Sequence, residues 1–387
     1  MRLKHWIPSR RRWVLFSSDN GVCVVMYRSI AEKLRGDRRI RQFHSMHLKR
    51  LRQVNKRDRE DPRGFFAKYG IHEGVTPYKL ARNLPVDLFV TPTFSDKLHA
   101  RLARCRVQIF HGVSFKNYCI KEKALRYDRL FLPGPYHLRR YVESGLFREG
   151  DPRLQVIGLP KLDRLVDGSL DRSAILLELG LDPALRTVLY APTGDPGNSL
   201  FRHGEEILSA LSKLEVNLIV KPHDHADPDP ECKIRWSERL LGMRGERFAA
   251  HLGSDIVPLM FASDLLLTDA SSVAFEFTLL DRPIIHFEVP EIMNGRYSHM
   301  FDLSTWGMKG GHLVKAASEL LELVPRLLED PSEKREIRRA IARDLFHQPG
   351  RATDNAAAAI YDLVGLAPPP GRSMCEGTQR SAPSSLA

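Results

Sequence analysis

Several features that define common classes of protein are missing from this chain of 387 residues. No run of about 18 or more apolar residues occurs, which is roughly the length that a membrane-spanning helix needs. The N-terminus also lacks the apolar core of a secretory signal peptide. We therefore expect a protein that stays in the cytoplasm.

Cysteine is scarce, and the residue types that bind metals do not form a cluster in the sequence. The five cysteines include no Cys-x-x-Cys pair, which argues against a zinc knuckle and against a disulfide framework. No Asp-x-Asp pair stands at the end of an expected strand. The Asp and His residues between 224 and 229 are more typical of a polar loop than of a metal site. We expect no bound metal and no cofactor.

The net charge of +12 comes from one end of the chain. Residues 1–60 contain 17 Lys or Arg against 5 Asp or Glu, so the rest of the chain is formally neutral. Trp6 and Trp13 bracket these charges, as aromatic residues do at a membrane interface. A solvated surface and a nucleic-acid contact are the alternatives, but no helix-turn-helix or RNA-binding signature is present. The favoured interpretation is peripheral binding to the anionic inner face of the cell membrane, without a nucleic-acid partner.

Short apolar runs alternate with helix-like segments along most of the chain. Expected strands cover 13–18, 87–91, 107–112, 130–135 and 154–160, then 187–192, 218–221, 265–268 and 283–287. Expected helices lie near 24–35, 136–144, 172–179, 203–213, 273–280, 315–329 and 332–346. Strands separated by helices predict an α/β fold with two doubly wound, Rossmann-like halves and a central cleft.

The two halves suggest a division of the chain. We expect an N-terminal domain over residues 1–160, on the acceptor and membrane side, and a C-terminal, nucleotide-donor-binding domain over 161–366. Residues 367–387 are rich in Pro and Ser and carry few apolar residues. Such a segment cannot form a core, so we expect a disordered tail.

Polar and cationic residues follow two expected strands of the second half. They are Lys221 and His223 after one strand, and Thr268, Asp269, Ser271 and Ser272 after the other. The carboxyl ends of parallel strands meet at one edge of a sheet, where α/β proteins bind their ligands. Serine at a helix start leaves backbone N–H groups beside hydroxyls, which favours an anion such as phosphate. Ser271 as a plain helix cap is the alternative.

The first half offers a candidate base. His111 ends an apolar run and is followed by Gly112, which allows a ligand or another backbone to come close. The ordinary pKa of histidine, about 6.5, suits it to take a proton near neutral pH. A histidine at a strand end can also be purely structural, and that alternative stays open.

Seven segments of the chain resemble, in the same order, sequence blocks of the CDP-glycerol glycerophosphotransferases that build teichoic acids. They are His111–Lys116, Tyr127–Tyr136, Ile157–Leu165, Val188–Thr193, Val220–His223, Ser263–Ser272 and Arg282–Phe287. The resemblance implies a GT-B-like fold, with two Rossmann-like domains that face each other. It also implies transfer of glycerol phosphate from CDP-glycerol to a hydroxyl of a lipid-linked or cell-envelope polymer acceptor, with release of CMP.

The resemblance assigns roles to the candidate residues. His111 would be the general base, with Gly112 and Lys116 on the acceptor side. His223 would be the second catalytic residue, against the donor's diphosphate. The remaining candidates would bind the donor and its phosphates: Lys221, Thr268, Asp269, Ser271 and Ser272. Phosphoryl transfer needs oriented cations and N–H donors more than a strong nucleophile, so this arrangement requires no metal.

The chain departs from the family pattern at four places. Val113-Ser-Phe replaces the usual Thr-Pro-Leu, and Gly194-Asp195 stands where Trp-Arg is usual. Ala270 replaces Tyr, and Glu276 replaces Asp. These changes leave another cytidine or uridine diphosphate donor open. A glycosyltransferase, a UDP-sugar 2-epimerase-like enzyme of the same GT-B architecture, or a non-catalytic binding protein are the alternative functions.

Overall fold

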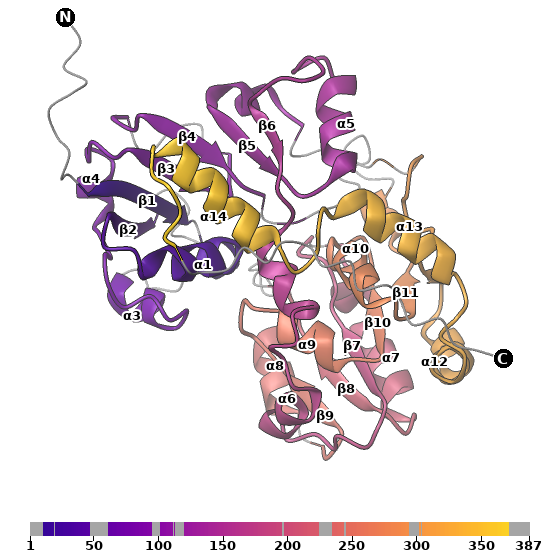
Figure 1. Ribbon diagram of the computed structural model, residues 1–387. Helices are drawn as coiled ribbons and strands as arrows, with labels where there is room; N and C mark the ends of the chain where they lie inside the picture. The colour runs from indigo at the N-terminus through magenta and orange to yellow at the C-terminus, as the bar shows by residue number, and fades with distance from the viewer. Residues whose placement is uncertain are drawn as a thin grey trace, which may run out of the picture.

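The computed structural model describes residues 11–18, 20–46, 61–94, 101–110, 112, 120–195, 197–223, 234–243, 245–293, 302 and 304–370. These residues form two lobes, each built on a six-stranded parallel sheet with helices around it (Figure 1). The predicted α/β fold class is therefore present in both halves of the chain.

The first lobe contains a sheet with the strand order β2-β1-β3-β4-β5-β6, and all its neighbours pair in parallel. Its strands are β1 (Arg12–Ser18), β2 (Ile40–Met46), β3 (Leu88–Thr91), β4 (Cys105–Gln108), β5 (Arg129–Leu132) and β6 (Leu154–Val156). Its described helical segments are α1 (Gly21–Arg35), α3 (Pro62–Ala67), α4 (Tyr78–Ala81), η3 (Glu122–Arg126) and α5 (Pro135–Glu143).

The second lobe repeats this design with the strand order β12-β11-β10-β7-β8-β9, again parallel throughout. Its strands are β7 (Thr187–Tyr190), β8 (Asn217–Val220), β9 (Phe248–Ala250), β10 (Leu265–Thr268), β11 (Ile284–Phe287) and β12 (His312–Val314). Its described helical segments are α6 (Arg172–Glu178), α7 (Ser199–Ser212), α8 (Trp236–Gly242), α9 (Val257–Ala262), α10 (Val273–Phe277), η5 (Thr278–Leu280), α11 (Pro290–Met293), η7 (Ala317–Glu319), α12 (Leu320–Glu329) and α13 (Arg335–Leu345).

The central strands form where the sequence has unbroken apolar runs. Every residue of β3, β7, β10 and β11 is buried. A parallel sheet with helices on both faces excludes water from both sides of its strands, so such runs need no alternation of polar and apolar residues. Helix α1 starts where the Asn20 side chain accepts a hydrogen bond of 3.0 Å from the N–H of Cys23.

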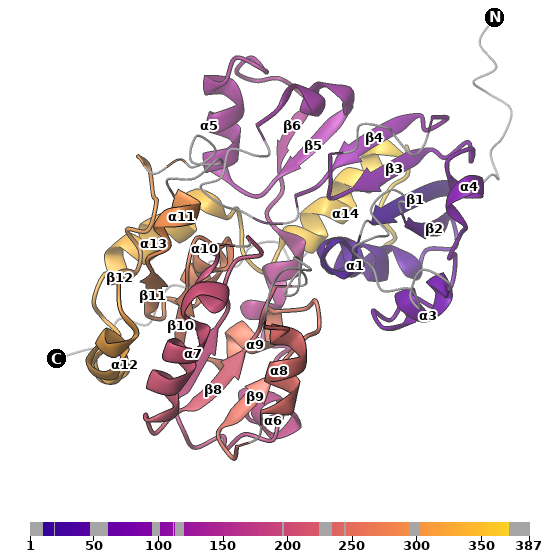
Figure 2. The same ribbon diagram turned by 180° about the vertical axis from the view of Figure 1, so that it is seen from behind.

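The last helix, α14 (Ala352–Leu363), returns to the first lobe. Its residues Ala356 and Ile360 are buried in the same apolar cluster as Val24 and Tyr27 of α1. Figures 1 and 2 both show α14 beside α1 and the first sheet. The predicted C-terminal domain, residues 161–366, includes this helix, whereas in the structure the helix packs on the first lobe.

A short 3-10 segment, η4 (Pro160–Leu165), connects the lobes. The carboxylate of Asp163 accepts hydrogen bonds from the N–H groups of Ala352 and Thr353, at 3.1 and 2.7 Å. It therefore caps the start of α14. Arg164 donates a hydrogen bond of 2.7 Å to Asp255 of the second lobe. The connection is thus tied to both lobes through its own side chains.

Parts of the predicted features lie outside the described residues. They include residues 1–10 and 47–60 of the basic region, the polar loop 224–233 and most of the tail, 371–387. In the remainder, no helix is both long enough and apolar enough to cross a membrane. The run predicted as a strand over 107–112 is strand only as far as Gln108.

Candidate functional site

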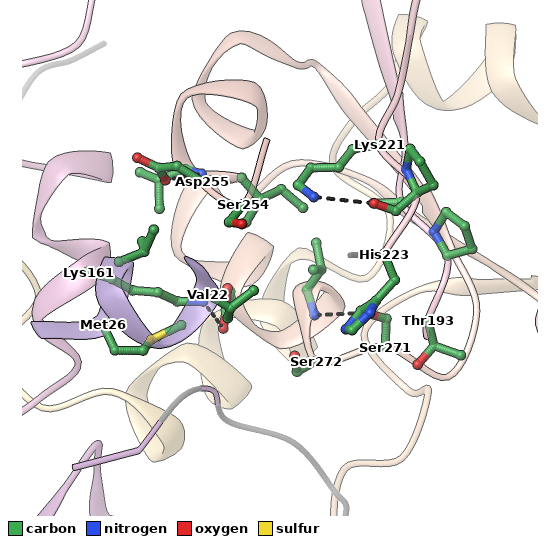
Figure 3. A pocket seen from close by; sticks show the side chains of 18 residues that line it. Val22, Met26, Lys161, Thr193, Lys221, His223, Ser254, Asp255, Ser271 and Ser272 are labelled. Carbon is green, nitrogen blue, oxygen red and sulfur yellow. Dashed lines mark hydrogen bonds and ion pairs between the residues drawn. The ribbon is translucent and has the colours of Figure 1, made fainter. Parts of the chain in front are cut away.

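A cavity of about 210 Å³ lies between the two lobes. The first lobe contributes the start of α1, and the connection contributes Lys161. The second lobe contributes the segments that follow β7, β8, β9 and β10. The lining residues are Val22, Val25, Met26, Lys161, Ala191, Pro192, Thr193, Lys221, Pro222, His223, Ser254, Asp255, Ile256, Val257, Ser271, Ser272, Val273 and Glu276 (Figure 3). Proteins with open α/β sheets bind their ligands at this kind of place, past the carboxyl ends of the strands.

Lys221 and His223 stand in the cavity wall directly after β8. Lys221 is buried, with its ammonium 3.3 Å from the carbonyl oxygen of Pro222, to which it donates. His223 is exposed at the mouth of the cavity. The strand geometry therefore brings together the two cationic candidates that the sequence predicts.

Ser271 and Ser272 also line the cavity, but they do different things. The hydroxyl of Ser271 accepts a long hydrogen bond of 3.4 Å from the N–H of Val273. Ser272 is the residue that precedes α10, and its side chain makes no capping bond. Helix α10 has only five residues, so few peptide dipoles add up at its start. An anion in the cavity would be held mainly by the cationic side chains and by hydroxyls such as that of Ser272.

Thr268 and Asp269 do not line the cavity, although they stand at the end of β10, just before Ser271 and Ser272. The Thr268 hydroxyl donates to the carbonyl oxygen of Ala191 at 2.6 Å. The Asp269 carboxylate accepts from the N–H of Thr193 at 2.7 Å, and from the N–H and hydroxyl of Ser199 at 2.9 and 2.8 Å. These bonds fix both ends of the loop between β7 and α7. Both residues therefore support the cavity wall from behind.

A buried ion pair that the sequence analysis did not predict crosses one side of the cavity. The Lys161 ammonium lies 2.7 Å from Oε1 of Glu276, and the two side chains are only 6% and 1% exposed. Burial raises the pKa of the Glu276 carboxyl, and Lys161 opposes that rise. A sequence signal existed for Glu276, because it lies four residues after Ser272 and so on the same face of a helix. Lys161 gave no such signal.

Gly112 brings the first lobe to the start of α10. A Cβ atom at this position would lie 3.3 Å from the hydroxyl of Ser272 and 3.5 Å from Oε1 of Glu276. Only a residue without a side chain leaves this approach unhindered. Its neighbour His111 and the other acceptor-side candidate, Lys116, lie outside the described residues. Among the candidates, the structure thus brings Gly112 to Ser272 and gathers Lys221, His223 and Ser271 around the same cavity.

A family model described as CDP-Glycerol:Poly(glycerophosphate) glycerophosphotransferase matches residues 2–362. The chain belongs to this family. A teichoic acid glycerol-phosphate transferase of Staphylococcus aureus is 25% identical over 247 residues, which are 61% of this chain and 60% of the relative. A teichoic acid poly(glycerol phosphate) polymerase of Bacillus spizizenii is 28% identical over 191 residues, which are 46% of this chain and 44% of the relative. The chain thus spans less than two thirds of the length of either relative.

Solved structures with the same architecture support the fold. The wall teichoic acid polymerase TagF matches with a TM-score of 0.66 and 16% identity, over 92% of this chain and 89% of that one. A putative UDP-N-acetylglucosamine 2-epimerase from Listeria monocytogenes matches with a TM-score of 0.56 and 15% identity, over 91% and 96%. Identities this low show the fold alone. The predicted GT-B-like arrangement of two parallel-sheet lobes is confirmed.

Proposed function

We propose that this glycerophosphotransferase-family chain moves glycerol phosphate from CDP-glycerol to a hydroxyl of a lipid-linked or cell-envelope polymer acceptor and releases CMP. The observation that carries the proposal is the cavity between the lobes. It has Lys221, His223 and Ser272 in the walls from the second lobe, and Gly112 from the first lobe comes close to Ser272. The names of the two curated relatives, a glycerol-phosphate transferase and a polymerase, point to the same chemistry.

The proposed step is one displacement at phosphorus. The acceptor's hydroxyl oxygen attacks the phosphorus that carries the glycerol, and the bond from that phosphorus to the oxygen shared with the second phosphate breaks. CMP leaves with the electron pair of that bond. The hydroxyl proton passes to His111, whose proposed role rests on its place next to Gly112.

The second-lobe residues would stabilise the charge that develops in this step. Negative charge accumulates on the phosphoryl oxygens and on the departing CMP. Lys221 and His223 supply cationic or N–H groups from one wall, and Ser272 supplies a hydroxyl. Where a bound donor displaces water from the cavity, such oriented groups would act more strongly than they do in solution. Thr268 and Asp269 would contribute by holding the loop that forms the wall.

The division of labour between the lobes is part of the proposal. Residues 1–160 would receive the acceptor, and the second lobe would bind the nucleotide. The basic region would hold the enzyme on an anionic membrane surface at the inner face of the cell membrane, where a lipid-linked acceptor is found. In its described part, the Arg41 guanidinium lies 5.9 and 5.2 Å from the ring centroids of Trp13 and Phe43. The exposed Arg41 thus lies beside a partly buried tryptophan and a buried phenylalanine, so cationic and aromatic groups are adjacent there.

Product analysis tests the function directly. The full chain is incubated with a lipid-linked acceptor and either CDP-glycerol or a set of UDP-sugars, and the released nucleotide is identified. We expect CMP from CDP-glycerol and an acceptor that gains mass in steps of glycerol phosphate. Release of UDP alone, or epimerisation of a UDP-sugar without transfer, would overturn the proposal in favour of the alternatives.

A further inference from the structure

The carboxylate of Glu276 is buried in the cavity wall with few hydrogen-bond donors around it. The Lys161 ammonium lies 2.7 Å from Oε1, and no described residue donates a hydrogen bond to Oε2. A buried carboxylate normally has its oxygens paired, because removing them from water without replacement is costly. The missing donors are therefore a feature that needs an explanation.

A purely structural role does not account for this geometry. The neighbouring polar residues of the connection are well paired: Asp163 accepts two backbone N–H groups, and Arg164 bonds Asp255 at 2.7 Å. These residues already tie the connection to both lobes. A buried ion pair by itself adds little stability once desolvation is counted. Among these residues, the Glu276 carboxylate is thus the group that lacks hydrogen-bond donors.

The position of Glu276 indicates what could complete it. Glu276 lines the cavity one helical turn beyond Ser272, and its Oε1 is near the position where Gly112 comes closest. Figure 3 shows Lys161 on the α1 side of the cavity, with His223 and Thr193 on the opposite side. The carboxylate therefore belongs to the side of the cavity that adjoins Gly112 of the first lobe, away from His223.

The chemistry of a carboxylate narrows the ligand group further. An ionised carboxylate only accepts hydrogen bonds, and it repels phosphate. Among the parts of the proposed donor, only the cytosine amine and the hydroxyls of ribose and glycerol donate hydrogen bonds. In the proposed step the attacked phosphorus faces the acceptor side, and the glycerol is attached to that phosphorus. The Gly112 side is the acceptor side of the proposed step, so of these groups the glycerol hydroxyls are the ones that reach this side of the cavity.

We propose that Glu276, held by Lys161, accepts hydrogen bonds from the free hydroxyls of the donor's glycerol and so selects a polyol phosphate for transfer. This inference rests on the proposed function. Lys161 acts as a positioning residue: its charge keeps the buried carboxylate ionised and therefore able to accept.

Calorimetric titration of the full chain with CDP and with CDP-glycerol, without acceptor, tests the proposal. Both ligands share the nucleotide, and only CDP-glycerol has the polyol. We expect Glu276→Gln to weaken CDP-glycerol binding about ten-fold or more, as for the loss of a hydrogen bond to a charged group, and to leave CDP binding within about two-fold. An equal loss for both ligands, or no loss for either, would overturn the proposal.

A second variant keeps the test valid if Glu276→Gln folds poorly. The double change Lys161→Met with Glu276→Leu removes both buried charges together, which proteins often tolerate. It should keep CDP binding and lose the preference for CDP-glycerol; an unchanged preference would again contradict the proposal. The unmodified chain separates failure of this inference from failure of the proposed function. If the proposed function is wrong, the unmodified chain should bind CDP-glycerol no better than CDP, whatever the variants do. That result would remove the basis of this inference as well.

Discussion

The imidazole ring of His223 packs directly over Gly194. A Cβ atom on residue 194 would lie 2.5 Å from Nδ1 of the histidine, closer than such contacts occur. Gly194 belongs to the Gly194-Asp195 departure from the family pattern. Because glycine has no side chain, it leaves the space that this ring occupies. This departure from the family pattern therefore affects where the His223 ring can lie.

Gly194→Ala should therefore displace His223 and lower kcat/KM for CDP-glycerol by about ten- to a hundred-fold, because small displacements of a positioned group are costly. Thermal stability should change little, since an exposed ring can turn away. The matched control is Gly242→Ala, where a Cβ atom meets nothing within 4 Å. Equal activity of the two alanine variants would show that the place of the His223 ring is unimportant for catalysis.

Removal of the two candidate histidines should separate catalysis from folding. His111→Ala and His223→Ala are each expected to lower turnover by about two or more orders of magnitude, as for the loss of a general base or of transition-state stabilisation. The melting temperature should stay nearly constant. His72→Ala, at an exposed position outside the cavity, serves as the control. Variants that lose stability yet keep specific activity would instead identify structural histidines.

The strands that the sequence predicts well are those with unbroken apolar runs at the centre of each sheet. The sequence pattern does not predict β2, β9 and β12, which are strands at the edges of the two sheets. These strands are short or mixed in polarity, because an edge strand is covered on fewer sides. Helix α14 is also not predicted, and its packing on α1 depends on contacts between distant segments. Local patterns carry no information about such contacts.

The candidate site shows the same limit. The rule that ligands bind past the strand ends finds Lys221, His223, Ser271 and Ser272. It cannot tell which side chains at a strand end turn into the cavity, and so it groups Thr268 and Asp269 with them. The Lys161–Glu276 pair forms only because the connection folds against α10, a relationship that no spacing along the chain reports.

A substitution of Asp269 tests whether this residue contacts the donor, as predicted from the sequence, or holds the loop behind the cavity wall. Asp269→Asn replaces one acceptor oxygen by an NH₂ group that faces N–H and O–H donors. We expect the free energy of unfolding in urea to fall by about 1–3 kcal/mol, because buried polar groups lose their partners. Nucleotide binding should weaken only to the extent that the loop moves. Full stability with strongly reduced binding would instead place Asp269 against the donor, as the sequence predicts.

Sedimentation with lipid vesicles tests the role of the basic region. The chain should pellet with vesicles rich in phosphatidylglycerol at about 0.05 M salt and be largely released at about 0.5 M, because salt screens exposed charges. Neutral phosphatidylcholine vesicles are the control. Binding that is absent, or equal on both lipids and insensitive to salt, would leave the basic region without an electrostatic membrane role.

Stability should fall as the pH is lowered from 7 to 5, because buried histidines must take up protons on unfolding. Burial lowers the pKa of His137 and of His286 to about 4, and that of His44 to about 3. Between these values and the ordinary value of about 6.5, the unfolded chain binds more protons than the folded one, so stability rises with pH in that window. Each fully buried histidine contributes about 1.4 kcal/mol per pH unit there.

His137 is the histidine best suited to check this dependence. Neither of its ring nitrogens has a hydrogen-bond partner in the part of the chain that the structure describes, and its ring lies 5.9 Å from that of Phe110. Because no described residue forms a hydrogen bond with this buried ring, His137→Phe should keep the fold and reduce the slope of unfolding free energy against pH between about 5 and 6. His72→Phe, at an exposed position, should leave the slope unchanged. Identical slopes in both variants would mean that His137 takes up its proton equally easily in the folded and unfolded chains.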